Sequence, residues 1–284
     1  MIPAQFEYLA PTSVEEALAA LAEHGDEAKV LAGGQSLLPV LRMRLNAPEL
    51  IVDIGGIDSL RNMVDEGDSV LIGAMVPYYQ ILADPSVQTG LGLLHKAITA
   101  VADPQIRHRG TLGGALVHAD PAGDCGAAIL ALDAELVISG QGGERTVAAA
   151  DFFEDLFATA VGEDELLTHI RVPKLDGWGS HYEKFVRLAQ QWPIVAVAAA
   201  VKTDGGTISE ARIGLVNMGS TALRATATEQ ALVGQEATEA GVREACDLAA
   251  EGTSPPADLN GDADYRKHLA TVLTRRAVLA AAGN

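Results

Sequence analysis

Two short glycine-rich runs contain the residues of this sequence that are best suited to holding a ligand. The first run, residues 31–39, reads LAGGQSLLP, and its Gly33 and Gly34 follow a short apolar stretch. Because glycine allows turns that a Cβ would resist, the run predicts a strand, a turn and then a helix. Ser36 is a good N-cap for that helix, and Pro39 is tolerated in its first turn. Backbone N–H groups at such a helix start suit a pyrophosphate.

The second run lies about eighty residues later and has a similar composition. Residues 109–115 read RGTLGGA, with the hydroxyl of Thr111 close in sequence to Gly113 and Gly114. Further on, Asp120 and Pro121 have the residue types of an N-cap and a first helical position. Either run alone is also typical of an ordinary glycine turn, but the pair with these flanks is more specific.

No self-contained catalytic or metal centre emerges from the remaining residues. The seven histidines are scattered, without the spacing of a metal site. Cys125 and Cys246 are the only cysteines, so the chain cannot ligate an iron–sulfur cluster by itself. We therefore predict no catalytic residue and no metal ligand, and a bound cofactor would have to carry any chemistry.

Composition narrows the class of protein. The chain has 284 residues, of which 48% are hydrophobic and 20% charged, which predicts a sizeable core and one to three domains. A formal charge of −18 opposes binding to nucleic acid or to an anionic membrane. We see no signal-peptide pattern and no apolar run of membrane-spanning length. We expect a soluble cytoplasmic protein.

The order of predicted elements gives an α+β fold in three parts. Residues 1–56 combine a helix from Val14, strands at 29–32 and 50–54, and a helix at 37–45, which form a βαβ-like unit. Residues 57–175 contain strands at 69–73, 135–138, 145–147 and 166–172 and a helix at 91–101, which suggest a mostly antiparallel sheet.

Residues 176–284 form the third predicted domain. Strands at 182–188, 194–202 and 208–216 predict a three-stranded antiparallel sheet, with a hairpin at Asp204-Gly205-Gly206. Helices are predicted at 225–233, 240–251 and 265–281.

The segments AGGQSLLP and RGTLGGALVHADPAGD resemble the two flavin-binding loops of the molybdenum hydroxylase flavoproteins, the family that includes xanthine dehydrogenase. Within that family the likeness is greatest to the medium, FAD-binding subunits of aerobic carbon monoxide dehydrogenases, and it covers nearly the whole chain. The resemblance implies a two-subdomain FAD-binding fold of the PCMH (vanillyl-alcohol oxidase-like) type, followed by a C-terminal domain like that of the carbon monoxide dehydrogenase flavoproteins.

The resemblance also implies cofactor-binding residues. In the family the first loop binds the FAD pyrophosphate, and its counterparts here are Ala32, Gly33, Gly34, Gln35 and Ser36, continued by Leu37 and Leu38. The second loop corresponds to Thr111, Gly113 and Gly114. Further counterparts are Asp124 at the ribityl or nucleotide portion, Leu167 at the adenine, Lys184 near the flavin or pyrophosphate, and the aromatic Trp192 at the isoalloxazine face.

Two positions depart from the family pattern. Gln35 stands where His is common, although an amide can donate the same kind of hydrogen bond. Gln191-Trp192-Pro193 stands where a run similar to Asp-Tyr-Ala is common, so access to the flavin face is the property most open to change.

The function that the resemblance implies is that of an electron-transfer subunit of an oxidoreductase. A large partner subunit with a molybdenum cofactor would oxidise the substrate, carbon monoxide with water to CO2. Two [2Fe–2S] clusters in a small partner subunit would pass electrons through non-covalent FAD in this chain to a quinone or another acceptor. The implied assembly is a dimer of heterotrimers, with peripheral contact to a quinone-reducing membrane partner left open.

Three alternatives remain at this point. The chain could be the flavoprotein subunit of a xanthine, nicotine or aldehyde hydroxylase, since such subunits resemble one another. It could be a self-contained FAD-dependent oxidase or reductase, although no substrate-facing acid or base is evident. It could also be a non-catalytic nucleotide-binding module, which flavin redox activity would separate from the others.

Overall fold

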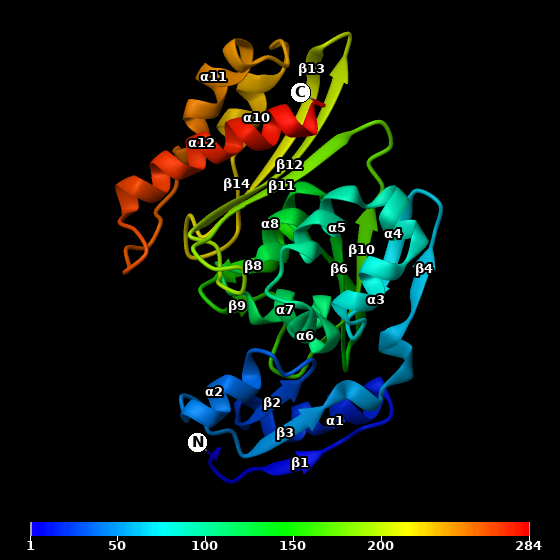
Figure 1. The fold of residues 1–284 in the computed structure, drawn as a ribbon. Helices are drawn as coiled ribbons and strands as arrows, with labels where there is room; N and C mark the ends of the chain where they lie inside the picture. Colours follow the sequence, from blue (N-terminus) through cyan, green and yellow to red (C-terminus); the bar gives the residue numbers. More distant parts are fainter. Residues whose placement is uncertain (1, 284) are drawn as a thin grey trace.

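The computed structural model describes residues 2–283 and places three sheet-based units in a row. Figure 1 shows the N-terminal unit at one end, a central unit of helices around a sheet, and the C-terminal unit at the other end. The three main sheets fall within residues 1–56, 57–175 and 176–284. The domain boundaries themselves stay a prediction.

The N-terminal unit is a three-stranded parallel sheet in the order β1-β3-β2. Its elements are β1 (Glu7–Leu9), α1 (Val14–His24), η1 (Gly25–Glu27), β2 (Ala28–Leu31), α2 (Leu37–Met43), β3 (Leu50–Asp53) and η2 (Ile54–Gly56). The predicted βαβ-like unit is confirmed, because β2 and β3 are parallel neighbours joined through α2. α1 begins as predicted, since the Ser13 hydroxyl accepts a hydrogen bond from the Glu16 amide at 3.2 Å.

The central unit contains a five-stranded antiparallel sheet in the order β4-β5-β10-β6-β7, with helices packed on it. Its first elements are η3 (Asp58–Arg61), β4 (Met63–Asp65), β5 (Ser69–Gly73), α3 (Tyr78–Ala83), α4 (Pro85–Gly90), α5 (Gly92–Thr99) and α6 (Pro104–Arg109). They are followed by α7 (Leu112–His118), α8 (Asp124–Ala131), β6 (Glu135–Gly140), β7 (Gly143–Ala148), α9 (Ala149–Phe152), β8 (Phe153–Asp155), β9 (Ala158–Thr159) and β10 (Leu166–Pro173). The antiparallel sheet was predicted, but most of the short helices were not.

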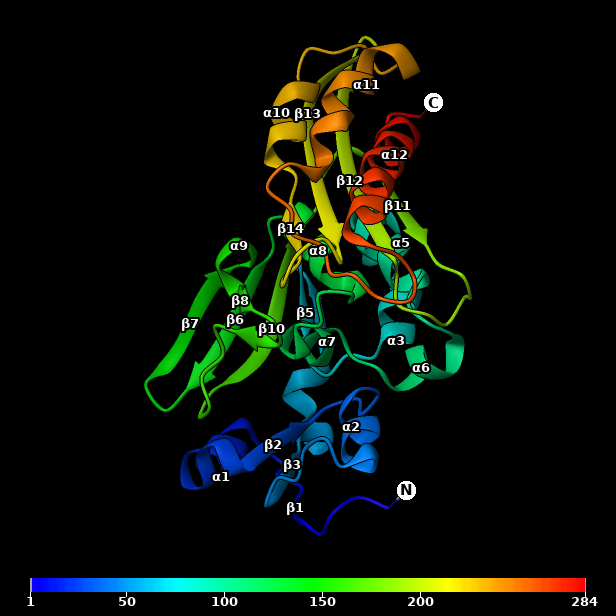
Figure 2. The same ribbon diagram turned by 90° about the vertical axis from the view of Figure 1, so that its left-hand side faces the viewer.

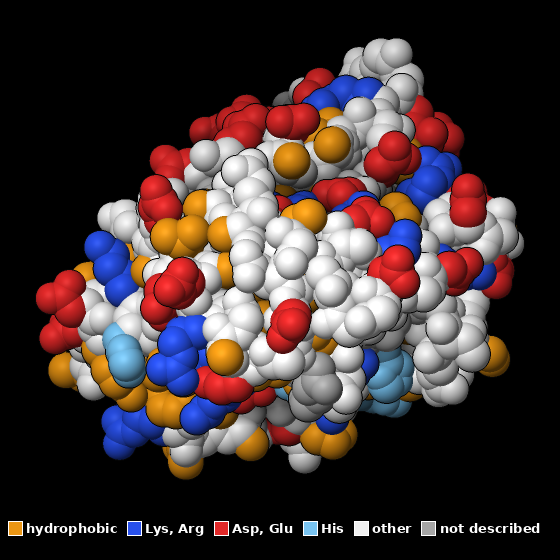
Figure 3. Space-filling view, turned by 90° about the horizontal axis from the view of Figure 1, so that it is seen from above, with side chains coloured by type: hydrophobic (Ala, Val, Ile, Leu, Met, Phe, Trp, Pro, Cys, Tyr) orange, Lys and Arg blue, Asp and Glu red, His pale blue; other side chains and the backbone are white. Residues whose placement is uncertain are grey.

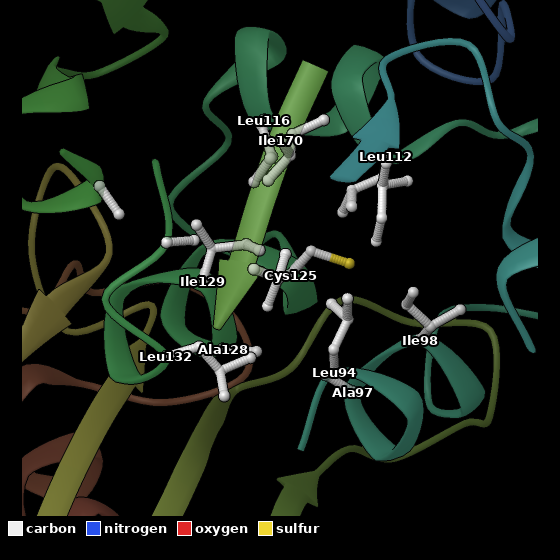
Figure 4. Packing of buried hydrophobic residues seen from close by; sticks show 14 of the residues in the cluster. Leu94, Ala97, Ile98, Leu112, Leu116, Cys125, Ala128, Ile129, Leu132 and Ile170 are labelled. Carbon is white, nitrogen blue, oxygen red and sulfur yellow. The ribbon is translucent and has the colours of Figure 1, made fainter. Parts of the chain in front are cut away.

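The largest hydrophobic core lies between this sheet and its helices. Figure 4 shows side chains from α5, α7, α8 and β10 converging on one volume around Cys125. Leu112 and Leu116 come from one face of α7, and Leu94 and Ile98 come from α5. The helix predicted at 91–101 is present as α5, and its Leu94 and Ile98 side chains are fully buried.

The C-terminal unit is a four-stranded antiparallel sheet covered by helices. Its elements are β11 (Gly179–Phe185), β12 (Val195–Asp204), β13 (Thr207–Val216), β14 (Leu223–Arg224), α10 (Thr226–Leu232), α11 (Glu239–Asp247), η4 (Leu248–Ala250) and α12 (Ala263–Ala281). The predicted three strands are present, but the sheet has a fourth, β14, whose two residues are too short to show a period-2 pattern.

The β12–β13 turn matches its prediction. Gly205 and Gly206 both have positive φ, 56° and 85°, and Asp204 pairs with Thr207 across the turn. Two consecutive left-handed residues are what a tight two-residue hairpin requires, and glycine adopts them without strain.

One local prediction after the second glycine run is wrong. The run itself opens a helix, since Gly113 and Gly114 lie in the first turn of α7. The helix predicted to begin at Asp120 and Pro121 is absent there, because Asp120 does not cap a helix. Its carboxylate accepts from the Ala122 amide at 2.9 Å in a turn, and α8 begins later, at Asp124. Side-chain capping of a turn and of a helix use the same residue types, so the sequence pattern does not separate them.

The C-terminal sheet packs directly on a helix of the central unit. Figure 2 shows α8 below the lower ends of β13 and β14. At the contact, a Cβ on Gly214 of β13 would lie 2.1 Å from the Ala127 carbonyl oxygen of α8. Only glycine allows the strand and the helix backbone to approach this closely.

The acidic composition is visible at the surface of the C-terminal end. Figure 3, which looks onto that end, shows Asp and Glu side chains spread over the face among fewer Lys and Arg. Within the described residues, every helix falls short of the length and apolarity that a membrane span requires.

The Gly214 contact gives a stability prediction. Gly214→Ala should lower the free energy of unfolding by about 1–3 kcal/mol, because the added methyl group overlaps the α8 backbone. Gly142→Ala is the matched control, since its Cβ would meet no atom within 4 Å and its effect should stay within about 0.5 kcal/mol. Urea unfolding of both variants measures the difference, and equal stabilities would show that the two units are not packed in this way.

Candidate cofactor site

The first glycine run forms the turn between β2 and α2 and leaves a row of backbone donors without partners. Gly34 has φ +75°, which lets the chain reverse direction before the helix. Within residues 2–283, the amides of Gly33 to Leu37 donate no hydrogen bond to the protein, and the first amide of the helix that does so belongs to Leu38. Five consecutive free N–H groups form the nest predicted from the sequence.

The side chains of this run add a donor and support the turn. Gln35 Nε2 donates to the Gly33 carbonyl at 3.0 Å, so this amide stabilises the loop backbone. Ser36 occupies the N-cap position of α2, but its hydroxyl makes no capping hydrogen bond, contrary to expectation. The hydroxyl is therefore available to a ligand. Leu37 begins the helix, and Leu38 packs beneath the Gly34 turn with 43% of its surface exposed.

The second glycine run differs because its donors are already used. Thr111 is the N-cap of α7, and its hydroxyl accepts from the Gly114 amide at 3.1 Å. The amides of Leu112 and Gly113 donate to the carbonyls of Val76 and Ala74. A Cβ on Gly113 would lie 2.5 Å from that of Ala74. Gly113 is therefore a close-packing residue.

The structure brings the two runs together. A Cβ on Gly33 would lie 2.3 Å from the Arg109 carbonyl oxygen and 2.9 Å from the Gly110 Cα. A Cβ on Gly114 would lie 3.1 Å from the Ala32 Cβ. Glycine at both positions thus allows the second run to support the first from behind, and the free amides belong to the supported run.

Asp124 and Lys184, which the sequence placed at the site separately, form a buried ion pair. Lys184 Nζ lies 2.9 Å from Asp124 Oδ2, and each side chain is only 8% exposed. Lys184 also donates to the Ala100 carbonyl at 2.9 Å, and the Tyr182 hydroxyl donates to Asp124 Oδ1 at 2.7 Å. Burial raises the pKa of Asp124, and Lys184 and Tyr182 oppose that rise.

Sequence reasoning did not find Tyr182, although a signal for it was present. Tyr182 and Lys184 are two apart on β11, and residues two apart on a strand share one face. Because Lys184 was predicted at the site, Tyr182 could have been predicted beside it on the same face of the strand. On α8 the next residue, Cys125, hydrogen-bonds the Tyr78 hydroxyl at 3.7 Å, and burial raises the pKa of this thiol to about 12. Cys125 is thus a protonated core residue and not a nucleophile.

The two remaining predicted residues lie in contrasting surroundings. Leu167 on β10 is 4% exposed and belongs to the central hydrophobic core. Trp192 is 61% exposed in the loop between β11 and β12, and among residues 2–283 its ring stacks on no aromatic or cationic group. The adenine and isoalloxazine contacts predicted for these residues stay predictions.

The geometry fits a pyrophosphate-bearing cofactor. A pyrophosphate offers only acceptor oxygens, and the first run offers free amides and the Ser36 hydroxyl as donors. Residues 2–283 contain no cluster of three or more His, Cys, Asp or Glu side chains arranged to hold a metal ion. The fold and the site together define a chain of the two-subdomain flavoprotein class.

Comparison with known families agrees with this class. The family model described as the FAD binding domain in molybdopterin dehydrogenase matches residues 4–175, and the model of the CO dehydrogenase flavoprotein C-terminal domain matches residues 180–281. The chain belongs to the molybdopterin dehydrogenase FAD-binding family, as the resemblance of its glycine runs indicated.

Individual relatives match over their whole lengths. The carbon monoxide dehydrogenase medium chain of Hydrogenophaga pseudoflava is 42% identical, with 99% of this chain and 98% of the relative covered. The glyceraldehyde dehydrogenase medium chain of Sulfolobus acidocaldarius is 35% identical, with 98% of each chain covered. A solved structure of carbon monoxide dehydrogenase from Hydrogenophaga pseudoflava superposes with a TM-score of 0.96 at 44% identity, covering 99% of this chain and 98% of that one.

The free amides of the first run give a binding prediction. Gly34→Val should weaken FAD binding by about 100-fold or more, because losing two hydrogen bonds to a charged phosphate costs about 3 kcal/mol or more. A β-branched residue at φ +75° would force the turn to change and would press on Leu38. FAD affinity is measured by titration of the apo-protein.

Gly177→Val is the matched control for Gly34→Val, since Gly177 has φ +77° and open space around its Cβ position. It should carry the same backbone strain without loss of FAD affinity. Gly113→Val, by contrast, would overlap Ala74 and reduce stability, so it does not isolate binding. Equal FAD affinities for the Gly34 and Gly177 variants would place the pyrophosphate elsewhere.

The buried ion pair gives a pH-dependent prediction. Lys184→Met should lower the free energy of unfolding by about 3–5 kcal/mol at neutral pH, because it leaves the Asp124 carboxylate buried without its counter-charge. The pKa of folded Asp124, which burial already raises above its ordinary value, then rises further because Lys184 no longer opposes the effect of burial. The variant should therefore be most stable in acid and should lose stability as pH increases from about 3.9, the unfolded value, through the raised folded pKa.

Adding Asp124→Asn to Lys184→Met tests the cause. The double variant should recover part of the lost stability and should lose this pH dependence, because no carboxylate remains at position 124. Denaturant unfolding between pH 4 and pH 8 measures both effects. A Lys184→Met profile that runs parallel to that of the unaltered protein would contradict the prediction.

Proposed function

We propose that the chain is the FAD-binding, electron-transferring medium chain of a molybdenum hydroxylase of the carbon monoxide dehydrogenase type. The observation that carries the proposal is the row of five unpaired amides from Gly33 to Leu37, beside a free Ser36 hydroxyl. Family membership supports it, because the matching model describes an FAD binding domain and covers residues 4–175.

Each predicted site residue has a role in this proposal. Residues 32–37 hold the pyrophosphate through backbone N–H groups and the Ser36 hydroxyl, while Thr111, Gly113 and Gly114 support that loop from behind. Asp124 lies at the ribityl or nucleotide portion and Lys184 near the flavin or the pyrophosphate, with Leu167 at the adenine and Trp192 over the isoalloxazine. FAD supplies the redox chemistry when bound, and the chain supplies binding and orientation.

Binding without a covalent bond to the cofactor is part of the proposal. Residues 31–39 and 109–115 contain no Cys or His side chain that could attach to a flavin. Cys125, the nearest cysteine in sequence, is buried as a protonated thiol. Denaturation should release free FAD.

The proposed partners are a large molybdenum-containing chain and a small [2Fe–2S] chain, which together form a dimer of heterotrimers in the cytoplasm. Electrons would enter from the small chain and leave to a quinone or another carrier. Support comes from the solved relatives: one is a Cu,Mo carbon monoxide dehydrogenase, 37% identical to this chain, and another is a carbon monoxide dehydrogenase that lacks the Mo-pyranopterin moiety of its molybdenum cofactor. The glyceraldehyde dehydrogenase medium chain is also 35% identical, which supports a substrate site in the large partner and not in this chain.

Reduction experiments test the relay. The isolated chain with FAD should be bleached by dithionite but should stay oxidised under carbon monoxide, because it contains no centre able to oxidise that substrate. The same flavin in the assembled complex should be bleached by carbon monoxide. Absorbance near the flavin maximum measures both.

The Gly34→Val variant provides the control within the complex. Carbon monoxide should still reduce the partner's iron–sulfur clusters, while delivery to an external acceptor should be lost. Turnover of carbon monoxide by the isolated chain would contradict the relay and favour a self-contained flavoenzyme. A complex bleached by another hydroxylase substrate and not by carbon monoxide would retain the relay and change the substrate.

A further inference from the structure

The loop that carries Trp192 is fixed at both ends of its exposed tip, although Trp192 itself has few protein contacts. The loop covers residues 186–193, between β11 and β12, and its base is closed by the Ile194 amide, which donates to the Phe185 carbonyl at 2.9 Å. Gln190 donates to Asp103, the N-cap residue of α6. An aromatic side chain that is 61% exposed must take its position from the backbone on either side.

Asn217 holds the C-terminal end of this loop. Its side-chain amide donates to the Pro193 carbonyl at 2.9 Å and to the Ile194 carbonyl at 3.3 Å. Its backbone amide donates to the Pro121 carbonyl at 2.8 Å, three residues before Asp124. Asn217 therefore connects the Trp192 loop to the segment that leads into the candidate site. It does so from a left-handed conformation with φ +63°, which asparagine tolerates better than most residues.

Arg266 on α12 holds the same point from the other side. Its Nη1 donates to the Ile194 carbonyl, and its Nη2 lies 2.8 Å from Asp258 Oδ1. The residue is completely buried, and its Nε has no protein partner. Burying a guanidinium with an unsatisfied N–H reduces stability relative to an apolar side chain of the same size. Stability alone therefore does not explain an arginine here, whereas a fixed position for Ile194 does.

We propose that Asn217 and Arg266 are positioning residues that hold the 186–193 loop where Trp192 covers one face of the isoalloxazine. Both residues belong to the C-terminal part of the chain, and the partners of their side chains are Pro193, Ile194 and Asp258, none of which is a predicted cofactor-binding residue. They act through the carbonyls of Pro193 and Ile194, immediately after Trp192. The inference rests on the proposed FAD site and adds a control of flavin exposure to it.

Emission from bound FAD tests the inference, because an indole ring stacked on the isoalloxazine quenches it by electron transfer, which a phenyl ring does not do. Trp192→Phe sets the level without tryptophan quenching. Arg266→Met and Asn217→Asp should each show loss of the Trp192-dependent quenching, with emission close to that of Trp192→Phe and with FAD affinity retained. Aspartate keeps the shape of asparagine and tolerates positive φ, but its carboxylate cannot donate to a carbonyl. Asn217→Asp also preserves the test if Arg266→Met fails to fold.

Two controls separate positioning from general loss of structure. Arg275→Met removes another α12 arginine, whose Nε lies 3.1 Å from Glu239, and should leave emission unchanged. In the Trp192→Phe background, Arg266→Met should add nothing, because residues that act through Trp192 are not additive with its removal. Wild-type quenching in the folded Arg266 and Asn217 variants, or an equal rise in Arg275→Met, would overturn the inference.

The outcomes also separate this inference from the proposed function. Failure of the unaltered chain to bind FAD would overturn the proposed function itself. A different result would overturn only the placement of Trp192. In that case Gly34→Val would abolish FAD binding, which supports the proposed pyrophosphate site, but Trp192→Phe would leave the emission of bound FAD unchanged.

Discussion

The close approach of two backbones, at Gly33 and at Arg109–Gly110, is the constraint on which the rest of the site depends. A Cβ atom at position 33 would lie 2.3 Å from the Arg109 carbonyl oxygen, which is too close for any residue other than glycine. Because the first run rests on the second, its turn can expose five amides without collapsing onto them. A nest of free donors persists only where the surrounding structure holds it open.

Two runs with similar sequences thus do different work. In the first run the amides of Gly33 to Leu37 donate no hydrogen bond within residues 2–283, while in the second Thr111 and the carbonyls of Ala74 and Val76 accept from the amides. Glycine at position 34 serves a left-handed turn, whereas glycine at position 113 serves contact with Ala74. A glycine pair in a sequence therefore indicates either close packing around the Cβ position or a left-handed backbone conformation. The sequence alone does not show which of the two applies.

The sequence predicted long periodic elements well and local endings poorly. Several elements were predicted to within a few residues, because burial of one face gives the apolar residues a regular spacing in the sequence. These are the strands at 69–73, 166–172 and 208–216 and the helix at 265–281. The helix start predicted at Asp120 was wrong, because α8 begins only at Asp124 and because Asp, Pro and Gly occur in turns and at helix ends alike. The pairing of Asp124 with Lys184 depends on residues 60 apart, and no local pattern encodes it.

The Asp124–Lys184 pair joins the central and C-terminal units, so cutting the chain between them would separate the two charges. Both glycine runs precede residue 175, so a fragment ending there would contain every backbone donor of the candidate site. It would also contain Asp124 without Lys184 and Tyr182, and Ala127 without the strand that covers it. Such a fragment would hold a bare carboxylate in a newly opened apolar surface. The C-terminal sheet therefore completes the interior of its neighbour, even though the free backbone donors of the candidate site lie in the N-terminal unit.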